Sequence, residues 1–228
     1  MRVALISDLH GNMPAVEAME QDLYRRGIDR VWCLGDLVGK GPSSDRTFDW
    51  VMEHCEVILR GNWDEGIGRR LFPNDKFYYR QLGEKRLQQL SAFPLEKHVT
   101  LGGRKIRLLH GRPVTKTLHS PHGPPDVLHA LFEPDFHVVV YADTHRQALR
   151  TLRGTLCNIG SVGNGLGVCR VQYGILEGPE GETDAPLDIQ LVTVPYDVEK
   201  AVADTLAQPD LPNGHLFIQE LRTGVYAR

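Results

Sequence analysis

Five short polar segments constrain this chain most strongly, because each follows directly on an apolar run with the composition of a buried strand. The segments are Asp8-Leu9-His10-Gly11-Asn12, Gly35-Asp36-Leu37-Val38-Gly39-Lys40-Gly41-Pro42, Gly61-Asn62-Trp63-Asp64, His110-Gly111-Arg112-Pro113 and Ala142-Asp143-Thr144-His145. In a parallel sheet the carboxyl ends of neighbouring strands meet at one edge. We therefore expect the Asp, Asn and His side chains to lie together there.

The order of the other elements in the first half favours an α/β fold. Strand-like runs at residues 3–7, 31–34 and 57–60 alternate with helix-like stretches, the first of which opens at Pro14 and ends near Gly27. Residues 65–95 are predicted to be helical and to cover the site. Their predicted core anchors are Leu82, Leu87, Leu90 and Phe93.

The second half of the chain is predicted to form a second sheet. Gly102-Gly103 stands between two β-rich runs, which is a strong signal for a tight hairpin. Further strands are expected at residues 136–141, 149–152, 156–159, 168–176 and 189–194, followed by a helix at 198–206. Two sheets packed face to face, with helices outside each, fit this order.

Length and composition are those of an ordinary globular protein. The 228 residues, 41% apolar and 24% charged, are enough for a single well-buried domain over residues 1–228. We assign the motifs to residues 2–165, and late strands and a helix to 166–228. A net charge of -3 without a basic stripe makes nucleic acid an unlikely partner. No run spans a membrane and the N-terminal run is too short for a signal segment, so we expect a cytoplasmic protein of unassigned oligomeric state.

The four cysteines are interpreted as reduced core thiols. They are widely spaced, and none forms a Cys-x-x-Cys pair. Zinc ligation is the alternative interpretation. The residues concerned are Cys33, Cys55, Cys157 and Cys169.

The polar segments contain the ligand types of a two-metal site. Asp8 and His10 can share a cation at a strand end, and the two oxygens of Asp36 can bridge two cations roughly 3.5–4 Å apart. Asn62 offers a neutral oxygen, and His110 and His145 offer imidazole nitrogens. A nitrogen and oxygen set without thiolate suits Mn, Fe, Co, Ni or Zn. Any one such residue is more often a helix cap or turn former, but their joint occurrence at five strand ends favours the metal site.

The ordered motifs resemble those of the calcineurin-like metallophosphoesterase superfamily. Asn158-Ile159-Gly160-Ser161-Val162-Gly163 and Tyr173-Gly174-Ile175-Leu176-Glu177 resemble its compact prokaryotic phosphodiesterase branch. The resemblance implies a four-layer αββα sandwich of two mixed sheets flanked by helices. It also implies a first metal on Asp8, His10, Asp36 and His145, and a second on Asp36, Asn62, His110 and the residue at 143. A hydroxide bridging the two metals would attack phosphorus in line.

One departure from the family pattern is Trp63, which stands where the family has a His that protonates the leaving group. A general acid contributes typically about 10²–10⁴-fold, most of all for a basic leaving oxygen. We therefore expect preference for good leaving groups, such as nucleotide phosphoanhydrides or aryl diesters. Trp63 is alternatively a packing or base-stacking residue at the rim. Asp64 is expected to keep an orienting role.

The second departure is Asp143, which stands where the family has His. With Asp143 as a ligand, two divalent ions face three carboxylates, which leaves a net charge of +1 instead of +2, and we expect Mn²⁺ to activate better than Zn²⁺. The alternative is that the short Asp143 side chain fails to reach a weak or absent second metal.

Arg112 and three loop histidines are further candidates. Arg112 is predicted to meet a phosphate bidentately, against the alternative of a surface residue. A substitute acid from His119, His122 or His129 is weighed against solvated loop histidines. The predicted function is hydrolysis of a small phosphorylated substrate, a phosphodiester or dinucleoside polyphosphate, in which Asn62, Asp64 and Arg112 assist the metals. The rival is a binding scaffold that has lost catalysis; the retained ligands argue against it.

Overall fold

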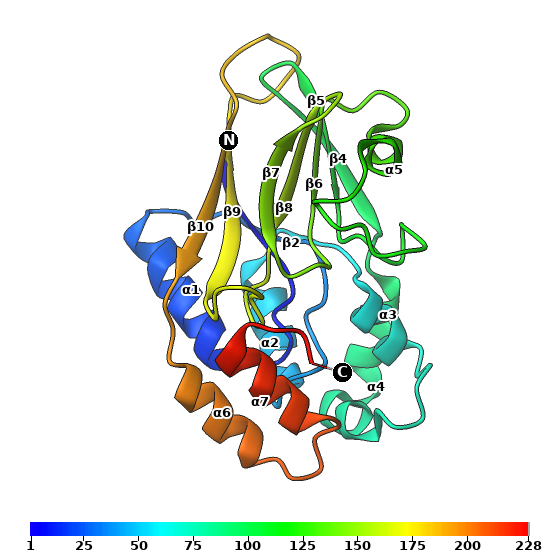
Figure 1. Ribbon diagram of the computed structural model, residues 1–228, viewed down its shortest axis with the longest axis vertical. Helices are drawn as coiled ribbons and strands as arrows, with labels where there is room; N and C mark the ends of the chain where they lie inside the picture. The colour runs from blue at the N-terminus through cyan, green and yellow to red at the C-terminus, as the bar shows by residue number, and fades with distance from the viewer. Residues whose placement is uncertain (228) are drawn as a thin grey trace.

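The computed structural model describes residues 1–227 as two five-stranded sheets packed face to face (Figure 1). The first sheet has the order β10-β9-β1-β2-β3, in which β1, β2 and β3 are parallel and β9 and β10 antiparallel. Its strands are β1 (Arg2–Ile6), β2 (Val31–Cys33), β3 (Val57–Ile58), β9 (Val171–Glu177) and β10 (Asp188–Val194). The strands predicted at 3–7, 31–34 and 57–60 lie in this sheet. The strands predicted at 168–176 and 189–194 were expected in the second sheet, and this was wrong: β9 pairs antiparallel with β1, so the chain returns to the first sheet.

The second sheet has the order β4-β5-β6-β8-β7 and is also mixed. Strands β5, β6 and β8 are parallel, and β4 and β7 are antiparallel edges. Its strands are β4 (Glu96–Leu101), β5 (Arg104–Leu109), β6 (Val138–Tyr141), β7 (Gln147–Thr151) and β8 (Thr155–Ile159). The predicted Gly102-Gly103 hairpin joins β4 to β5, with both glycines in the left-handed region at φ 54° and 71°.

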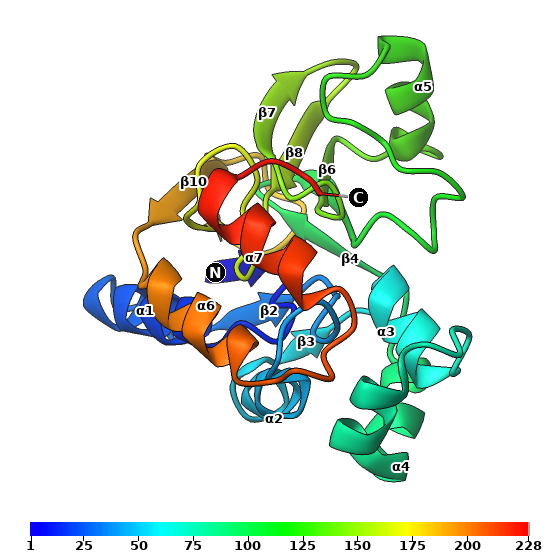
Figure 2. The same cartoon turned by 60° about the horizontal axis from the view of Figure 1, so that its bottom comes forward.

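Helices cover the outer face of each sheet, which confirms the predicted four layers (Figure 2). The first sheet packs on α1 (Met13–Arg25) and α2 (Ser44–His54). Helices α6 (Val198–Leu206) and α7 (Gly214–Thr223) share a small core of their own, and α6 packs against α1. The second sheet is covered by the short α5 (Pro125–His129) and a 3-10 turn, η1 (Ala130–Phe132). Side chains of both sheets meet in a middle core that includes Leu5, Leu34, Leu108 and Val140.

The predicted helical stretch at 65–95 consists of two helices, α3 (Asn62–Gly68) and α4 (Lys76–Ala92). They pack on each other below the end of β4, and α4 also packs against α2, where Arg86 pairs with Asp49 (Figure 2). Leu82, Leu87 and Leu90 are buried as predicted, and Phe93 is partly buried. Because α3 begins at Asn62, a predicted ligand lies in its first turn.

Two sequence expectations can be judged from the fold alone. All four cysteines are free thiols, and none belongs to a cluster of potential metal ligands among residues 1–227. Zinc ligation by cysteine therefore has no support. Within the same residues, no helix is long and apolar enough to cross a membrane.

Candidate metal centre

The carboxyl ends of β1, β2, β5 and β6 and the start of α3 carry all seven predicted ligands. Asp8 and His10 follow β1, Asp36 follows β2, and His110 follows β5. Asp143 and His145 follow β6, and Asn62 begins α3. Because the two sheets face each other, the ends of strands from both converge on one place, as the motif order predicted.

Asp8, His10 and His145 form the first cluster of potential ligands, and all three are buried. Asp8 Oδ1 lies 3.2 Å from His145 Nε2 and 3.6 Å from His10 Nε2. The two Nε2 atoms are 3.2 Å apart. Three potential ligand atoms thus surround one small space.

The outer nitrogens of these two imidazoles fix which inner atoms are free to bind a cation. His10 Nδ1 donates to the carbonyl oxygen of Val38 at 3.1 Å, and His145 Nδ1 donates to that of Asn164 at 3.0 Å. In the neutral rings both Nε2 atoms therefore present lone pairs to each other. A cation bound between the two Nε2 atoms would remove the repulsion between their lone pairs. The two backbone carbonyls hold the imidazole rings in the orientation that this binding requires.

Asp8, Asp36 and His110 form the second cluster. Asp36 Oδ2 lies 3.3 Å from His110 Nε2 and 3.7 Å from His10 Nε2, so it stands between the clusters. Asp36 Oδ1 instead accepts the Trp63 N–H at 2.8 Å. We expected two bridging oxygens from the sequence, whereas in this geometry Oδ2 alone faces both clusters.

Unpartnered buried atoms show that this space fits a divalent metal. Both Asp8 oxygens and His110 Nε2 are buried and have no hydrogen-bond partner among the described residues. Leaving a buried carboxylate unpaired is costly, and a metal bound to these atoms removes that cost. The nitrogen and oxygen donors suit the divalent first-row metals named above.

Neighbouring charges in the cluster shift the pKa values of its groups in the direction opposite to the shift caused by burial. Burial alone would raise the pKa of Asp8, but His145 and His110 hold it well below its usual range. Burial likewise disfavours the His110 imidazolium, yet Asp36 and Asp8 raise the pKa of His110 to about 10. In the metal-free protein a proton on His110 balances the carboxylates, so a cation that binds His110 must release that proton.

Asn62 and Asp143 lie at the outer side of the second cluster. Asp143 Oδ1 is 4.0 Å from His110 Nε2, and the Asn62 amide is 3.2 Å from the same oxygen. The Asn62 amide has two possible orientations. With its nitrogen toward Asp143 it donates a hydrogen bond to Oδ1, and with its oxygen on that side it offers a neutral ligand beside His110. Asp143 belongs to neither compact cluster, although both side chains border the second.

Arg112 binds Asp143 instead of pointing into open solvent. Its Nη2 donates to Oδ1 at 2.6 Å, its Nε to Oδ2 at 2.9 Å, and its backbone N–H to Oδ2 at 3.0 Å. Arg112 thus makes a bidentate contact with a carboxylate of the site, whereas the contact predicted from the sequence was with a phosphate. The Arg112 side chain stays 39% exposed, so a ligand can still reach it.

Asp64 holds the backbone of the site and is placed away from the metal clusters. Its Oδ2 accepts the N–H groups of Asp36 and Gly61 at 2.7 and 2.9 Å, and its Oδ1 accepts that of Leu37 at 2.9 Å. Burial and the Asp36 charge raise the pKa of Asp64 to about 7. Asp64 is thus a positioning residue for Asp36, which agrees with the expected orienting role.

Five of the seven predicted ligands have left-handed backbone conformations. Their φ angles lie between 47° and 66°, in a region that non-glycine residues rarely adopt. Such strain persists only where the surrounding structure imposes it, and it concentrates at functional sites. The residues are Asp8, His10, Asp36, Asp143 and His145.

Trp63 packs at the edge of the site. Its ring lies edge-to-face with His10, with centroids 5.8 Å apart, and its indole carbons cover Gly39 so closely that a side chain there would collide with them. The imidazoles of His119, His122 and His129 form no hydrogen bond or ion pair with the site in the described chain. A substitute acid from that loop therefore has no support.

The sequence analysis missed the groups that orient the imidazoles and a buried pair behind them. The orienting carbonyls leave no trace in the sequence; for Asn164 the one signal is its place in Gly163-Asn164-Gly165. Asn164 Nδ2 donates to Glu220 at 2.6 Å, and Glu220 also binds Lys40 at 2.8 Å. Helix α7 is thereby connected to the ligand His145.

Comparisons with known proteins agree with this geometry. Residues 1–178 match the family model of the calcineurin-like phosphoesterase superfamily domain. An uncharacterised protein of Methanocaldococcus jannaschii is 26% identical, over 87% of this chain and 89% of its own.

Two solved structures share the fold. A metallophosphoesterase from Sphaerobacter thermophilus is similar with a TM-score of 0.76, 24% identity and 99% of both chains covered. A protein described as a novel archaeal phosphodiesterase is similar with a TM-score of 0.52 and 18% identity, over 85% of this chain and 99% of that one. The family match covers all five motifs and most of both sheets. The chain belongs to the calcineurin-like phosphoesterase superfamily and is a hydrolase of that family.

Proposed function

We propose that the protein is a phosphodiesterase or phosphoanhydride hydrolase that uses two divalent metal ions. The observation that carries the proposal is the buried double cluster, with Asp36 Oδ2 between His10 and His110. When bound there, the two cations generate a nucleophile from water and neutralise charge on the phosphoryl oxygens. The chain's own residues fix where that chemistry occurs.

The protein residues position both the ligands and the phosphate. Asp36 would be shared by both ions. The other ligands of the first ion would be Asp8, His10 and His145, and those of the second His110, Asn62 and Asp143. Asp64 keeps the Asp36 loop in shape through three backbone N–H groups. The partly exposed Arg112 side chain lies beside Asp143, where it can donate to a phosphoryl oxygen.

The absence of an imidazole at position 63 sets the expected substrate. The indole of Trp63 cannot protonate a leaving oxygen, so the enzyme is proposed to act on small phosphorylated compounds whose leaving group is weakly basic. Nucleotide phosphoanhydrides and aryl diesters meet this condition. Carboxylate ligands favour a hard ion, and Mn²⁺ is proposed to activate better than Zn²⁺. The free cysteines fit the proposed cytoplasmic location.

Turnover of bis(p-nitrophenyl) phosphate tests the proposal. We expect hydrolysis by the apo-protein reloaded with Mn²⁺, weaker hydrolysis with Zn²⁺, and loss of at least about 10³-fold in kcat on Asp36→Ala. Asp188→Ala, an exposed position at the start of β10, is the matched control and should keep the wild-type rate. No turnover with any divalent metal would favour the rival scaffold function.

A further inference from the structure

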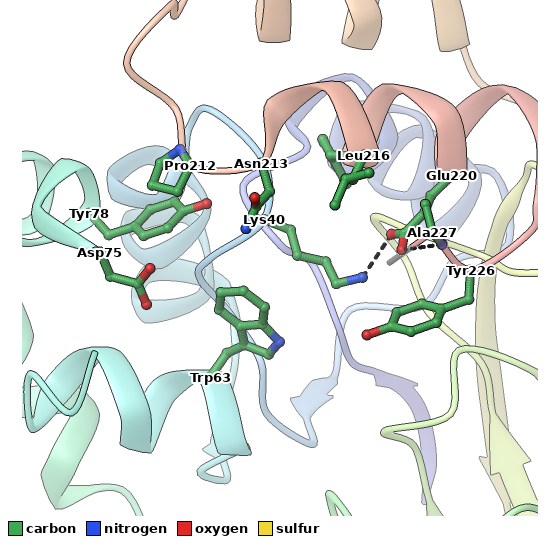
Figure 3. Close-up of a pocket in the computed structure, with 11 residues that line it drawn as sticks. Lys40, Trp63, Asp75, Tyr78, Pro212, Asn213, Leu216, Glu220, Tyr226 and Ala227 are labelled. Carbon is green, nitrogen blue, oxygen red and sulfur yellow. Dashed lines mark hydrogen bonds and ion pairs between the residues drawn. The ribbon is translucent and has the colours of Figure 1, made fainter. Parts of the chain in front are cut away.

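A cavity of about 240 Å³ lies beside the metal centre, between α3, α4 and α7 (Figure 3). Two of its lining residues come from metal-site loops. Trp63 directly follows Asn62, and Lys40 follows Asp36 in the loop whose Val38 carbonyl orients His10. The cavity therefore adjoins the loops of the metal site on the side of Trp63 and Lys40.

Aromatic rings form much of the cavity wall. Trp63, Tyr78 and Tyr226 line it, and the Trp63 and Tyr78 rings meet edge-to-face with centroids 6.4 Å apart. Figure 3 shows the Trp63 and Tyr226 rings on either side of the Lys40 side chain. The volume is below the roughly 300–1,000 Å³ of pockets for drug-sized ligands. It is suited to one planar ring system, for which aromatic faces are good stacking partners.

Two polar groups in this wall lack a partner in the protein. The Tyr78 side chain is only 1% exposed, yet its hydroxyl has no hydrogen-bond partner among residues 1–227. A buried hydroxyl without a partner is costly and points to a bound ligand or water. The Asp75 carboxylate also forms no hydrogen bond within the described chain, and Figure 3 shows it below the Tyr78 ring on the side of Trp63.

The charges of the cavity disfavour a second phosphate. Among residues 1–227, the one cationic side chain of its lining is Lys40, which is paired with Glu220 at 2.8 Å. Asp75 adds a carboxylate without a hydrogen-bond partner in the same residues, so the described lining carries net negative charge. A neutral ring that stacks on aromatic faces and donates N–H groups to a carboxylate fits this combination better than an anion does.

We propose that this cavity binds the nucleobase of a nucleotide, and that it selects bases with an exocyclic amino group. Asp75 accepts hydrogen bonds from that amino group, Tyr78 bonds a ring nitrogen or carbonyl, and Trp63 and Tyr226 contact the ring. The assignment of the nucleotide as a substrate rests on the proposed function. Binding of the base does not require turnover and is measured separately.

Binding to the full-length, metal-free protein is the first test. AMP, IMP and ribose 5-phosphate are titrated while quenching of tryptophan fluorescence is followed, since Trp63 lies in the cavity wall. We expect AMP to bind at least about tenfold more tightly than ribose 5-phosphate, as base stacking on aromatic side chains implies. IMP should bind more weakly than AMP, because its O6 places a carbonyl where Asp75 needs a donor. Equal affinity for AMP and ribose 5-phosphate would overturn the proposal.

Variants of the residues that line the cavity test whether the differences in affinity arise there. Asp75→Asn should abolish the preference for AMP over IMP, and Tyr78→Phe should weaken AMP binding while the ring wall is kept. Tyr24→Phe on α1 and Asp188→Asn on β10 are matched controls, because both lie exposed and outside the cavity lining. An unchanged AMP preference in Asp75→Asn would contradict the assignment of that residue.

Inhibition separates this proposal from the proposed function. With Mn²⁺ present, AMP should inhibit turnover of bis(p-nitrophenyl) phosphate with a lower inhibition constant than ribose 5-phosphate. Turnover without any such difference overturns the base cavity alone. Base-dependent binding without turnover overturns the hydrolase proposal and leaves the cavity assignment standing.

Discussion

Arg112 and Asp143 form a bidentate ion pair at the outer side of the second metal cluster, with Nη2 to Oδ1 at 2.6 Å and Nε to Oδ2 at 2.9 Å. The pair changes the charge expected from the sequence. With two divalent ions bound, three carboxylates would leave +1, and the guanidinium would add one positive charge and restore +2. In the proposed two-metal site the attraction for anions would thereby be kept despite the acidic residue at position 143.

Removing Arg112 should weaken the second metal position. Arg112→Ala leaves the Asp143 carboxylate without its partner and free to turn away from His110. Loss of a residue that orients a ligand typically costs about 10–100-fold in metal affinity or activity. Mn²⁺ affinity measured by calorimetry, together with diesterase rate, checks this. Arg153→Ala, which removes an exposed ion pair with Glu133, serves as the control. Unchanged affinity would show that Asp143 does not bind metal.

Asp64→Ala should destabilise the protein even without metal. The change strands three backbone N–H groups at buried positions, those of Asp36, Leu37 and Gly61. Each unsatisfied group costs about 1–3 kcal/mol, so we expect a loss of about 3 kcal/mol or more. Urea unfolding of the metal-free variant measures it. A loss below about 1 kcal/mol would mean that water replaces the carboxylate.

A methyl group at position 61 should displace the bridging carboxylate. A Cβ on Gly61 would collide with Asp36 Oδ1 and with the Asp36 backbone nitrogen, so the Asp36 loop must shift, although the extended backbone of Gly61 itself allows a side chain. Gly61→Ala is expected to reduce diesterase activity by at least about tenfold while the fold persists. Circular dichroism verifies folding. Gly214→Ala, where the new methyl meets only ordinary van der Waals contacts, should remain fully active.

An imidazole in place of Trp63 should restore acid catalysis. Trp63→His is expected to raise the rate for alkyl diesters relative to p-nitrophenyl diesters, by up to the roughly 10²-fold that marks the lower end of general acid catalysis. Steady-state rates are measured for diesters whose leaving groups increase in pKa, and the logarithm of the rate is plotted against that pKa to give a slope. Trp63→Phe opens the same space without an acid, and an identical slope in both variants would rule out protonation by the new side chain.

The stability contributed by Asp22 should disappear in acid. Burial would raise its pKa, but hydrogen bonds from Arg26 and Tyr173 outweigh burial and lower it from 3.8. A lowered folded pKa stabilises the protein fully above the unfolded value, and the contribution is lost as the pH falls through the folded value. The difference in unfolding free energy between wild type and Asp22→Asn should therefore shrink below about pH 3.8. A gap that stays constant as the pH falls from neutrality to below 3.8 would contradict the shift.

The sequence was sufficient to predict the strands and the convergence of the ligands, but it placed β9 and β10 in the wrong sheet, because their pairing with β1 depends on contacts between distant segments. The patterns that allowed this prediction are local. An apolar run indicates a strand, and the Asp, Asn or His that follows it indicates which potential metal ligand lies at the end of that strand. The helix at Val198–Leu206 was predicted with its observed bounds, because Asp197 caps it and its apolar residues are periodic. Strand ends differed by two or three residues, as for β6 and β9.

What the sequence did not reveal depends on contacts between distant segments. Helix α7 was not predicted, because it starts at Asn213-Gly214, a pair typical of turns, and Asn213 makes no side-chain cap. The pairing of Arg112 with Asp143 joins residues 31 positions apart. The single bridging oxygen of Asp36 depends on where the Trp63 N–H points, which no motif encodes.

The left-handed backbone at five of the ligands has a consequence for how the protein acquires its metals. Hydrogen bonds within the protein, such as those from three backbone N–H groups to Asp64, hold these loop shapes independently of any ligand bond to a particular ion. The same loops should therefore accept more than one divalent cation, and a single preparation, stripped and reloaded, should bind different metals in turn.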